Sequence, residues 1–156
     1  MNQRQWRLIC DEPAIGRWNM AVDEAILDAV GAGDQPPTLR LYAWQPACLS
    51  LGIGQSASDS VEAEIHARGW DIVRRPTGGR AILHIDELTY SLALPPHHSL
   101  TMLSIVDSYR QISRALMHAL QILGAAPVSQ RRDSEAAKRP GPVCFETPSH
   151  YEITVG

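Results

Sequence analysis

The middle of the sequence consists of short apolar runs that are separated by glycine, proline and other turn-forming residues. Their length and their alternation of apolar and polar positions are typical of β-strands, and they occupy residues 38–44, 48–54, 70–75, 81–84 and 87–94. Two similar runs lie near the ends of the chain, at residues 5–10 and 150–155. Because the runs follow one another closely, we expect them to pair mainly as adjacent hairpins, with 38–44 and 48–54 forming one of these.

Three other stretches repeat their apolar residues with the period of a helix. The first covers residues 17–30, and the second is a short helix within 59–69 that would have Asp59 or Ser60 as its N-cap and Gly69 just past its end. The third is the longest, and its apolar stripe consists of Ile105, Tyr109, Ile112, Leu116, Leu120 and Leu123. Strands in hairpins beside three helices predict an α+β fold with a mainly antiparallel mixed sheet, rather than a doubly wound one.

Composition narrows the class of protein. A chain of 156 residues with a net charge of −3 is expected to form one domain, and this charge does not indicate nucleic-acid binding. The N-terminus lacks the apolar run of a signal peptide, and no stretch reaches the roughly 18–20 apolar residues of a membrane span. Three widely spaced cysteines, none in a CxxC pair, argue against a disulfide framework. We therefore expect a soluble, cytoplasmic protein.

The segment RRPTGGRAILH, residues 74–84, is the strongest candidate for a binding site. Its three arginines, Arg74, Arg75 and Arg80, offer planar charged forks that match carboxylates and phosphates, and Gly78 and Gly79 let the backbone approach a ligand closely. The segment is neither a GxxxxGK[ST] phosphate loop nor a GxGxxG dinucleotide motif. It is either a strand-to-strand turn with its arginines in solvent or a ligand-binding loop, and three arginines beside one turn favour the second alternative.

A second candidate is Cys144, which lies in the sequence GPVCFETPSHYEI beside Glu146, Ser149 and His150. A cysteine thiolate is a strong nucleophile, and a nearby cation would be needed to raise the reactive fraction of a thiol whose ordinary pKa is about 8.5. Cys10 and Cys48 are expected to be small apolar residues without a reactive role. The charged stretch before Cys144, residues 128–142, lacks periodicity and is expected to be a mobile surface loop.

None of the six histidines shows the spacing of a metal-ligand pair, so no metal site is expected. His84 closes the glycine segment, where it either orients a substrate or is a half-buried structural residue. Trp44 ends a predicted strand, and its ring belongs either to the core or to the wall of an apolar slot.

Four segments, taken in order, resemble one known family. They read NMAVDEAIL, PPTLRLYAWQPACLSLGIGQ, RRPTGGRAILHIDELTYSLALP and CFETPSHYEI, and together they extend through most of the chain. They are similar to the lipoate–protein ligase and octanoyltransferase superfamily, whose fold is shared with the biotin protein ligase catalytic domain. The resemblance implies an antiparallel sheet and a glycine loop that cradle an acyl chain. Within the superfamily, RRPTGGRAILH followed by ELTYS looks most like the cysteine-dependent octanoyltransferases.

That resemblance implies two acyl transfers without ATP or another cofactor. Cys144 would take an octanoyl group from acyl carrier protein, and a lysine of a lipoyl domain or of glycine-cleavage H protein would then receive it. The backbone amides of Gly78 and Gly79 would stabilise the oxyanion, Arg75 and Arg80 would position the carrier or the carbonyl, and His84 would line the pocket. The remaining residues expected to bind substrate are Arg74, Thr77, Ala81 and Trp44.

The sequence departs from the family pattern in two places. The family usually has an aspartate directly after the histidine, where this chain has Ile85, and Asp86 follows one position later. The family also carries an essential lysine shortly after the YEI strand, and this chain ends at Gly156, before that position. The resemblance therefore implies the N-terminal part of a catalytic domain, which could be a split enzyme completed by a second polypeptide, a shortened chain or a remnant.

Two other functions remain open at this stage. One is an ATP-dependent lipoate ligase or a lipoyl amidotransferase, in which the glycine loop would hold an adenylate phosphate, with ATP and Mg²⁺ as cofactors, and Cys144 would be dispensable. The other is a non-catalytic module that binds a lipoyl domain or another chain. Dependence on ATP or on acyl carrier protein distinguishes the ligase from the transferase.

Overall fold

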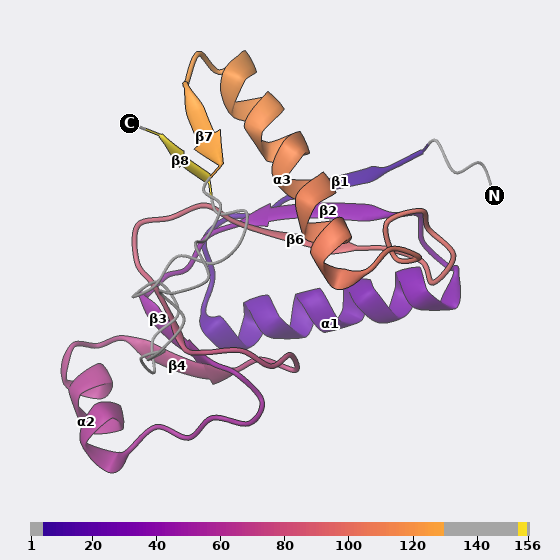
Figure 1. Cartoon of the computed structure of the whole chain (residues 1–156). Coiled ribbons are helices and arrows are strands. Elements are labelled where there is room, and N and C mark those ends of the chain that lie inside the picture. Colours follow the sequence, from indigo (N-terminus) through magenta and orange to yellow (C-terminus); the bar gives the residue numbers. More distant parts are fainter. Residues whose placement is uncertain (1–4, 130–152, 156) are drawn as a thin grey trace. The chain divides into compact units, whose positions relative to one another are not determined.

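The computed structural model describes residues 5–129 and 153–155, which form two units: residues 5–96, and residues 97–129 with 153–155 (Figure 1). Each unit is described by itself. The first unit contains β1 (Arg7–Cys10), α1 (Gly16–Ala32), β2 (Thr38–Tyr42), β3 (Cys48–Leu51), α2 (Asp59–Ala67), β4 (Asp71–Arg74), β5 (Ile82–His84) and β6 (Thr89–Ala93). The second contains α3 (Ile105–Ile122), β7 (Pro127–Ser129) and β8 (Ile153–Val155).

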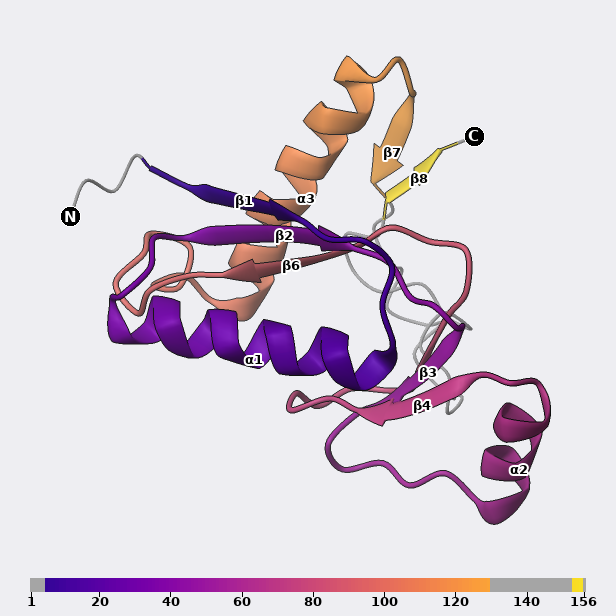
Figure 2. The ribbon, with the colours of Figure 1, turned by 180° about the vertical axis from the view of Figure 1, so that it is seen from behind.

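The first unit is built on two three-stranded sheets. In the first sheet the strand order is β1-β2-β6, with β1 parallel and β6 antiparallel to β2, and Leu41 stands opposite both Cys10 and Tyr90. Figure 2 shows α1 running along one side of this sheet, where it contacts β2 and β6. Helix α1 also contacts β4, so it joins the first sheet to the second.

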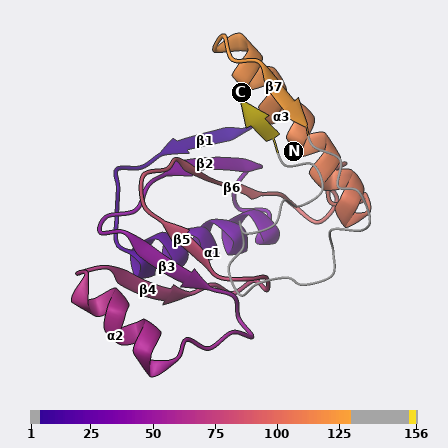
Figure 3. The same cartoon turned by 60° about the vertical axis from the view of Figure 1, so that its left-hand side comes forward.

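The second sheet has the order β4-β3-β5, with β4 parallel and β5 antiparallel to β3 (Figure 3). Its central strand β3 is buried at all four residues, because neighbouring strands cover its edges and other elements cover its faces. Helix α2 connects β3 to β4 and packs against β4.

The expected hairpin between 38–44 and 48–54 is wrong, although both strands exist. Strand β2 pairs with β1 and β6, whereas β3 pairs with β4 and β5, so the two strands belong to different sheets. The reason is that α1 and α2 each return the chain to a parallel neighbour, as a helical crossover does. The α+β fold class is confirmed, and antiparallel pairs outnumber parallel pairs by three to two among the described strands.

The most unusual feature of the first sheet is a completely buried arginine. The alternation in 38–44 suggests that Leu39 and Leu41 face inward, but Thr38, Arg40 and Tyr42 are the buried residues of β2. Arg40 has no exposed surface and donates from Nε to Asp11 at 2.7 Å and from Nη1 to Asp23 at 2.9 Å. This arginine therefore ties together β2, α1 and the segment after β1.

The two helices of this unit begin differently from the sequence expectation. Helix α2 has its N-cap at Ser58, one residue before Asp59, and the Ser58 side chain makes no capping hydrogen bond to the backbone. Helix α1 has no acidic residue in its first turn, and its first amide, Gly16 N, donates to Asp71 Oδ2 at 2.8 Å. Asp71 lies on β4, so the second sheet supplies a cap to a helix of the first sheet.

In the second unit, α3 contacts β7, and β7 pairs with β8 in antiparallel register. Ser104 caps α3 by accepting from the amide of Asp107 at 3.1 Å. Strand β8 is the described part of the run expected at 150–155, and its partner β7 had no visible signal. Residues 128 and 129 of the expected loop belong to β7, and the rest of 128–142 lies outside the described residues.

The expected apolar stripe of α3 is only partly covered. Ile105, Tyr109 and Leu123 are exposed, while the middle of the stripe is half-buried. Over residues 5–129 and 153–155, no helix has both the length and the hydropathy to cross a membrane.

Arg40→Ala should destabilise the protein by about 3–5 kcal/mol, because it leaves the Asp11 and Asp23 carboxylates without their buried cation. Arg68→Ala is the matched control, since Arg68 is half exposed in its ion pair with Glu64, and should cost less than about 1 kcal/mol. Urea unfolding of both variants measures the two costs. Equal effects would contradict the structural role assigned to Arg40.

Candidate functional site

The glycine segment lies directly on the chain that follows β3. Arg75 N donates to the Leu51 carbonyl at 2.8 Å, and Ile53 N donates to the Thr77 carbonyl at 2.9 Å. Between these bonds, Gly52 comes so close to the loop that a Cβ at this position would lie 2.2 Å from the carbonyl oxygen of Gly79. Gly79 itself has a φ of 96°, a conformation that residues with a side chain rarely adopt. The close packing of the loop on the chain after β3 therefore depends on two glycines, Gly52 after the strand and Gly79 in the loop.

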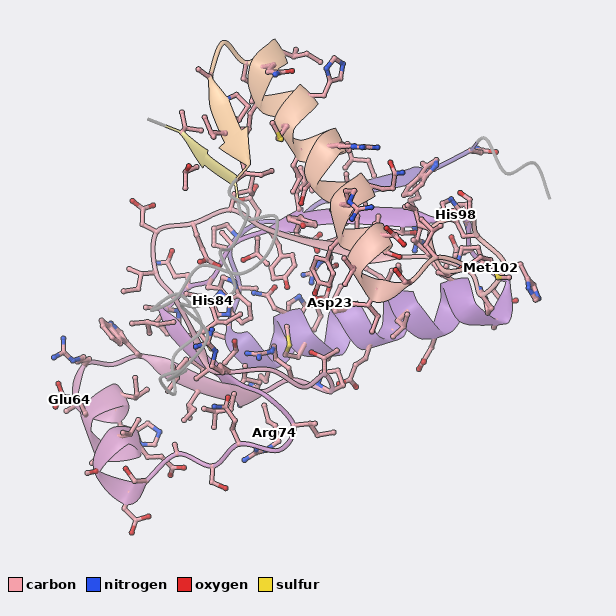
Figure 4. The ribbon with its side chains drawn as sticks, viewed as in Figure 1. Asp23, Glu64, Arg74, His84, His98 and Met102 are labelled. Carbon is pink, nitrogen blue, oxygen red and sulfur yellow. The ribbon has the colours of Figure 1, made fainter. Side chains whose placement is uncertain are left out.

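Two of the three arginines hold this pair of segments together. Arg74, labelled in Figure 4, donates from Nη1 to the carbonyls of Gly52, Ile53 and Gln55. Arg75 points the other way and donates from Nη2 to the carbonyls of Gly78 at 3.3 Å and Arg80 at 2.8 Å. Backbone carbonyls thus take up many of the donors that the sequence alone would assign to a ligand.

A pocket of about 260 Å³ lies beside the loop, between α1, β2 and β6. Its size is close to the lower end of small-molecule sites, about 300 Å³. The loop contributes Arg75, Pro76 and Thr77 to the wall. Most of the remaining wall is apolar, with side chains from Met20, Leu27, Tyr42, Tyr90, Leu92 and Ala93. The arrangement suits a small ligand that is largely apolar.

Asp23 is the hydrogen-bond partner of two polar residues of this wall, Tyr42 and Ser91. It projects from α1 toward the first sheet (Figure 4), where its carboxylate accepts from Arg40, from Tyr42 OH at 2.9 Å and from Ser91 Oγ at 2.7 Å. Burial, followed by the charge of Asp23, raises the pKa of the Tyr42 phenol above its usual range. The hydroxyl groups of Tyr42 and Ser91 therefore both bond to Asp23.

A second polar network lies at the other end of the glycine segment. His84, on β5, is buried and stacks on Trp44, with ring centroids 4.1 Å apart and an interplanar angle of 14°. Its Nε2 lies 2.7 Å from Ser50 Oγ, and its Nδ1 lies 2.5 Å from Glu87 Oε1. Ser50 Oγ also accepts from Arg75 Nη1 at 2.7 Å, which connects this network to the loop.

The structure brings together part of the residue set predicted from the sequence. Arg75 and Thr77 line the pocket, Gly78 and Gly79 form the exposed turn of the loop, and Ala81 packs into the core under it. Trp44 and His84 are both buried, their rings stack on each other, and neither residue lines the pocket. Arg80 is half-buried, and Cys144 lies outside the described residues.

Sequence reasoning missed two kinds of site residue. The apolar residues of the pocket wall, such as Met20 and Leu92, occupy positions that the sequence pattern assigns to the hydrophobic core. Ser50 and Glu87 lie within segments that carry the family resemblance, but neither was singled out as a site residue. Within the part of the chain described here, no group of three or more His, Cys, Asp or Glu side chains could hold a metal ion.

Two of the three cysteines can be placed. Cys48 is fully buried, and burial, with a further contribution from the Asp71 carboxylate, raises the pKa of its thiol from 9.0 to about 12. It is therefore protonated at neutral pH. Cys10 is exposed at the end of β1 and does not line the pocket.

A mostly apolar pocket beside a glycine loop, in which Asp23 bonds to Tyr42 and Ser91, is typical of a domain that binds a small, mostly apolar ligand. The chain belongs to the lipoyl protein ligase A/B catalytic domain family, whose profile matches residues 16–152.

Curated relatives carry the name octanoyltransferase LipM. The protein from Kyrpidia tusciae is 43% identical over 155 residues, which cover 96% of this chain and 57% of that protein. The protein from Brevibacillus brevis is 44% identical over 157 residues, which cover 97% and 57%. The chain thus spans somewhat more than half the length of the curated relatives it matches.

Solved structures give the same fold. Protein Ta0514 of Thermoplasma acidophilum, with bound lipoic acid, superposes with a TM-score of 0.70 at 25% identity, covering 89% of this chain and 56% of that one. A bipartite lipoate protein ligase from the same organism, studied with its E2 lipoyl domain, gives a TM-score of 0.66 at 28% identity, covering 84% and 49%.

Gly52→Ala should displace the glycine loop, because its methyl group would meet the Gly79 carbonyl, and should cost about 1–3 kcal/mol of stability. The control is Gly54→Ala, two residues later, where a Cβ meets nothing within 4 Å and the cost should stay within about 0.5 kcal/mol. Denaturant unfolding and amide exchange of Ile53 and Arg75, which bond the loop to the chain after β3, measure both effects. Amide exchange at the wild-type rate in Gly52→Ala would contradict the role of the Gly52–Gly79 contact in placing the loop.

Stability should fall at high pH through Cys48. Its pKa is higher in the folded state, so its contribution is complete below pH 9.0 and is lost as the pH rises toward 12. Over that window the wild-type protein should lose about 1.4 kcal/mol per pH unit more than Cys48→Ala. Cys10→Ala, which removes an exposed thiol, should follow the wild-type slope. Equal slopes for Cys48→Ala and wild type would show that the thiol ionises freely.

Proposed function

We propose that the protein carrying this chain is an octanoyltransferase of protein lipoylation. The observation that carries the proposal is the apolar pocket against the glycine loop, in a chain that is 43% identical to a curated octanoyltransferase. Because the chain spans 57% of that relative, the proposal concerns the activity of the whole protein.

The chemistry of the pocket supports an acyl ligand. Each buried methylene contributes about 0.8 kcal/mol, so a saturated chain gains affinity simply by leaving water for this wall. The carboxylate of Asp23 is already bonded to Arg40, Tyr42 and Ser91 and offers no free charge to a competing polar ligand. The chain's carbonyl end would lie toward the loop residues Arg75 and Thr77.

For the nucleophile we propose Cys144. The other two cysteines are poor candidates, because Cys48 is buried with a raised pKa and Cys10 does not line the pocket. The Cys144 thiolate would attack the carbonyl carbon of an octanoyl thioester, and the carrier's thiolate would leave. The amides of Gly78 and Gly79 would stabilise the oxyanion, and Arg80 would help to position the carrier.

In the second transfer, the neutral ε-amine of a lysine would attack the Cys144 thioester. The amide bond forms, the carbon–sulfur bond breaks, and the amine's proton passes to solvent or to the departing thiolate. Exchange of one thioester for another is nearly balanced and amide formation runs downhill, so this route needs neither ATP nor a metal.

We propose octanoyl-acyl carrier protein as the donor, and a lipoyl domain or glycine-cleavage H protein as the acceptor. The bipartite archaeal ligase was studied with a lipoyl domain, which supports an acceptor of that kind. A reducing cytoplasm would keep the thiol available.

Incubation with octanoyl-acyl carrier protein should increase the intact mass of the protein by one octanoyl group, because the acyl group moves to the thiol. Cys144→Ala should abolish the increase, whereas Cys10→Ala, as the matched control, should retain it. Intact-mass spectrometry reads all three proteins.

The absence of an adduct on the folded wild-type protein would contradict the proposal. Modification of a lipoyl domain with lipoate and ATP, unaffected by Cys144→Ala, would instead assign an ATP-dependent ligase.

A further inference from the structure

We propose that Glu87 is a positioning residue, which fixes the glycine loop beside the pocket through a chain of hydrogen bonds that passes along His84 and Ser50 to Arg75. The predicted effect on acyl binding rests on the proposed function, whereas the hydrogen-bond series from Glu87 to Arg75 is independent of it. Its four members come from the turn before β6, from β5, from β3 and from the start of the loop.

The chemistry of its ends gives the chain one direction. The Glu87 carboxylate only accepts, so His84 donates to it from Nδ1 across 2.5 Å. In a neutral imidazole the other ring nitrogen, Nε2, is an acceptor, and it lies 2.7 Å from the Ser50 hydroxyl, whose alternative acceptor, the Ile82 carbonyl, is farther away at 3.4 Å. The Ser50 oxygen accepts in turn from the Arg75 guanidinium, which only donates, at 2.7 Å. Each link thus has one donor and one acceptor, running from a cation to an anion.

The imidazole has little freedom to turn away from this role. One face stacks on Trp44, whose Nε1 donates to Thr89 Oγ1 at 2.7 Å. Thr89 Oγ1 donates to the same Glu87 oxygen that His84 uses, also at 2.7 Å. Glu87 is therefore held by two donors.

At the other end, the chain determines where the loop lies. Arg75 uses Nη1 on Ser50 and Nη2 on the carbonyls of Gly78 and Arg80, so its guanidinium lies between β3 and the glycine turn. Arg75 and Thr77 also line the pocket. A shift of the guanidinium would move the turn and this wall together.

A serine, a histidine and a glutamate in hydrogen-bonded order also form the hydrolase triad. Ser50 does not suit that role, because it has no exposed surface and its oxygen accepts from a cation. The same residue types here support a loop rather than attack a substrate.

Glu87→Ala tests the chain directly, with Asp86→Ala as the matched control, since Asp86 is a neighbouring exposed carboxylate. In the wild type, ¹⁵N NMR should find the His84 proton on Nδ1. In Glu87→Ala this tautomer should be lost, and the amides of Ile53 and Arg75, which donate to the carbonyls of Thr77 and Leu51, should exchange about tenfold faster. Glu87→Gln keeps an oxygen acceptor and should restore most of both signals, while Asp86→Ala should behave as wild type.

Ser50→Ala breaks the chain at a different link and should loosen the loop to a similar degree. Combined with Glu87→Ala it should add little, because both changes interrupt one chain. An unchanged His84 tautomer, normal loop exchange in Glu87→Ala or fully additive effects would each overturn the proposal.

Octanoate is the probe for the pocket. Calorimetry should find binding to Glu87→Ala about tenfold weaker than to wild type and Asp86→Ala. Failure of octanoate to bind the wild-type protein would count against the proposed function, while the tautomer and exchange measurements would still decide the role of Glu87.

Discussion

The bond between Arg40 and Asp23 is the interaction on which the rest of the first unit depends. A guanidinium with no exposed surface is stable only where acceptors surround it, and Asp11, Asp23 and Asn19 supply them. Asp23 also accepts from Ser91 at the oxygen that Arg40 uses, Oδ1, and from Tyr42 at its other oxygen, Oδ2. One ion pair thus fixes α1 on its sheet and also turns the polar ends of two pocket residues away from a ligand.

The sequence pattern predicted the elements well and their pairing poorly. The strands, the helices and the α+β class follow from local alternation and period, which act over a few residues. Strand pairing depends on where the crossover helices α1 and α2 place the next strand. The amino-acid sequences of β2 and β3 do not show that each is the central strand of its sheet. The inverted burial of β2 has the same cause, because an arginine is buried only when its distant acceptors are in place.

The segment RRPTGGRAILH was expected to bind a ligand because of its glycines and arginines, and the structure places Arg75, Pro76 and Thr77 of this segment in the wall of a pocket. The arginines were expected to offer their guanidinium groups to a ligand. In the structure, Arg74 and Arg75 donate hydrogen bonds to backbone carbonyls of the protein itself. Sequence shows which donors exist but not which acceptors they find, and Ser50 and Glu87 were invisible for the same reason. The nucleophile proposed at Cys144 rests on its sequence context, on the family motif and on the unsuitability of Cys48 and Cys10, since Cys144 itself lies outside the described residues.

The cap that Asp71 gives to α1 has a consequence for how the protein unfolds. The first amide of the helix and its carboxylate partner are 55 residues apart, on elements of different sheets. The helix that supports the first sheet is therefore incomplete until the second sheet has formed. Loss of either sheet exposes a helix end and leaves a charge without its partner, so the melting of one sheet also destabilises the other. The two sheets are consequently coupled in unfolding.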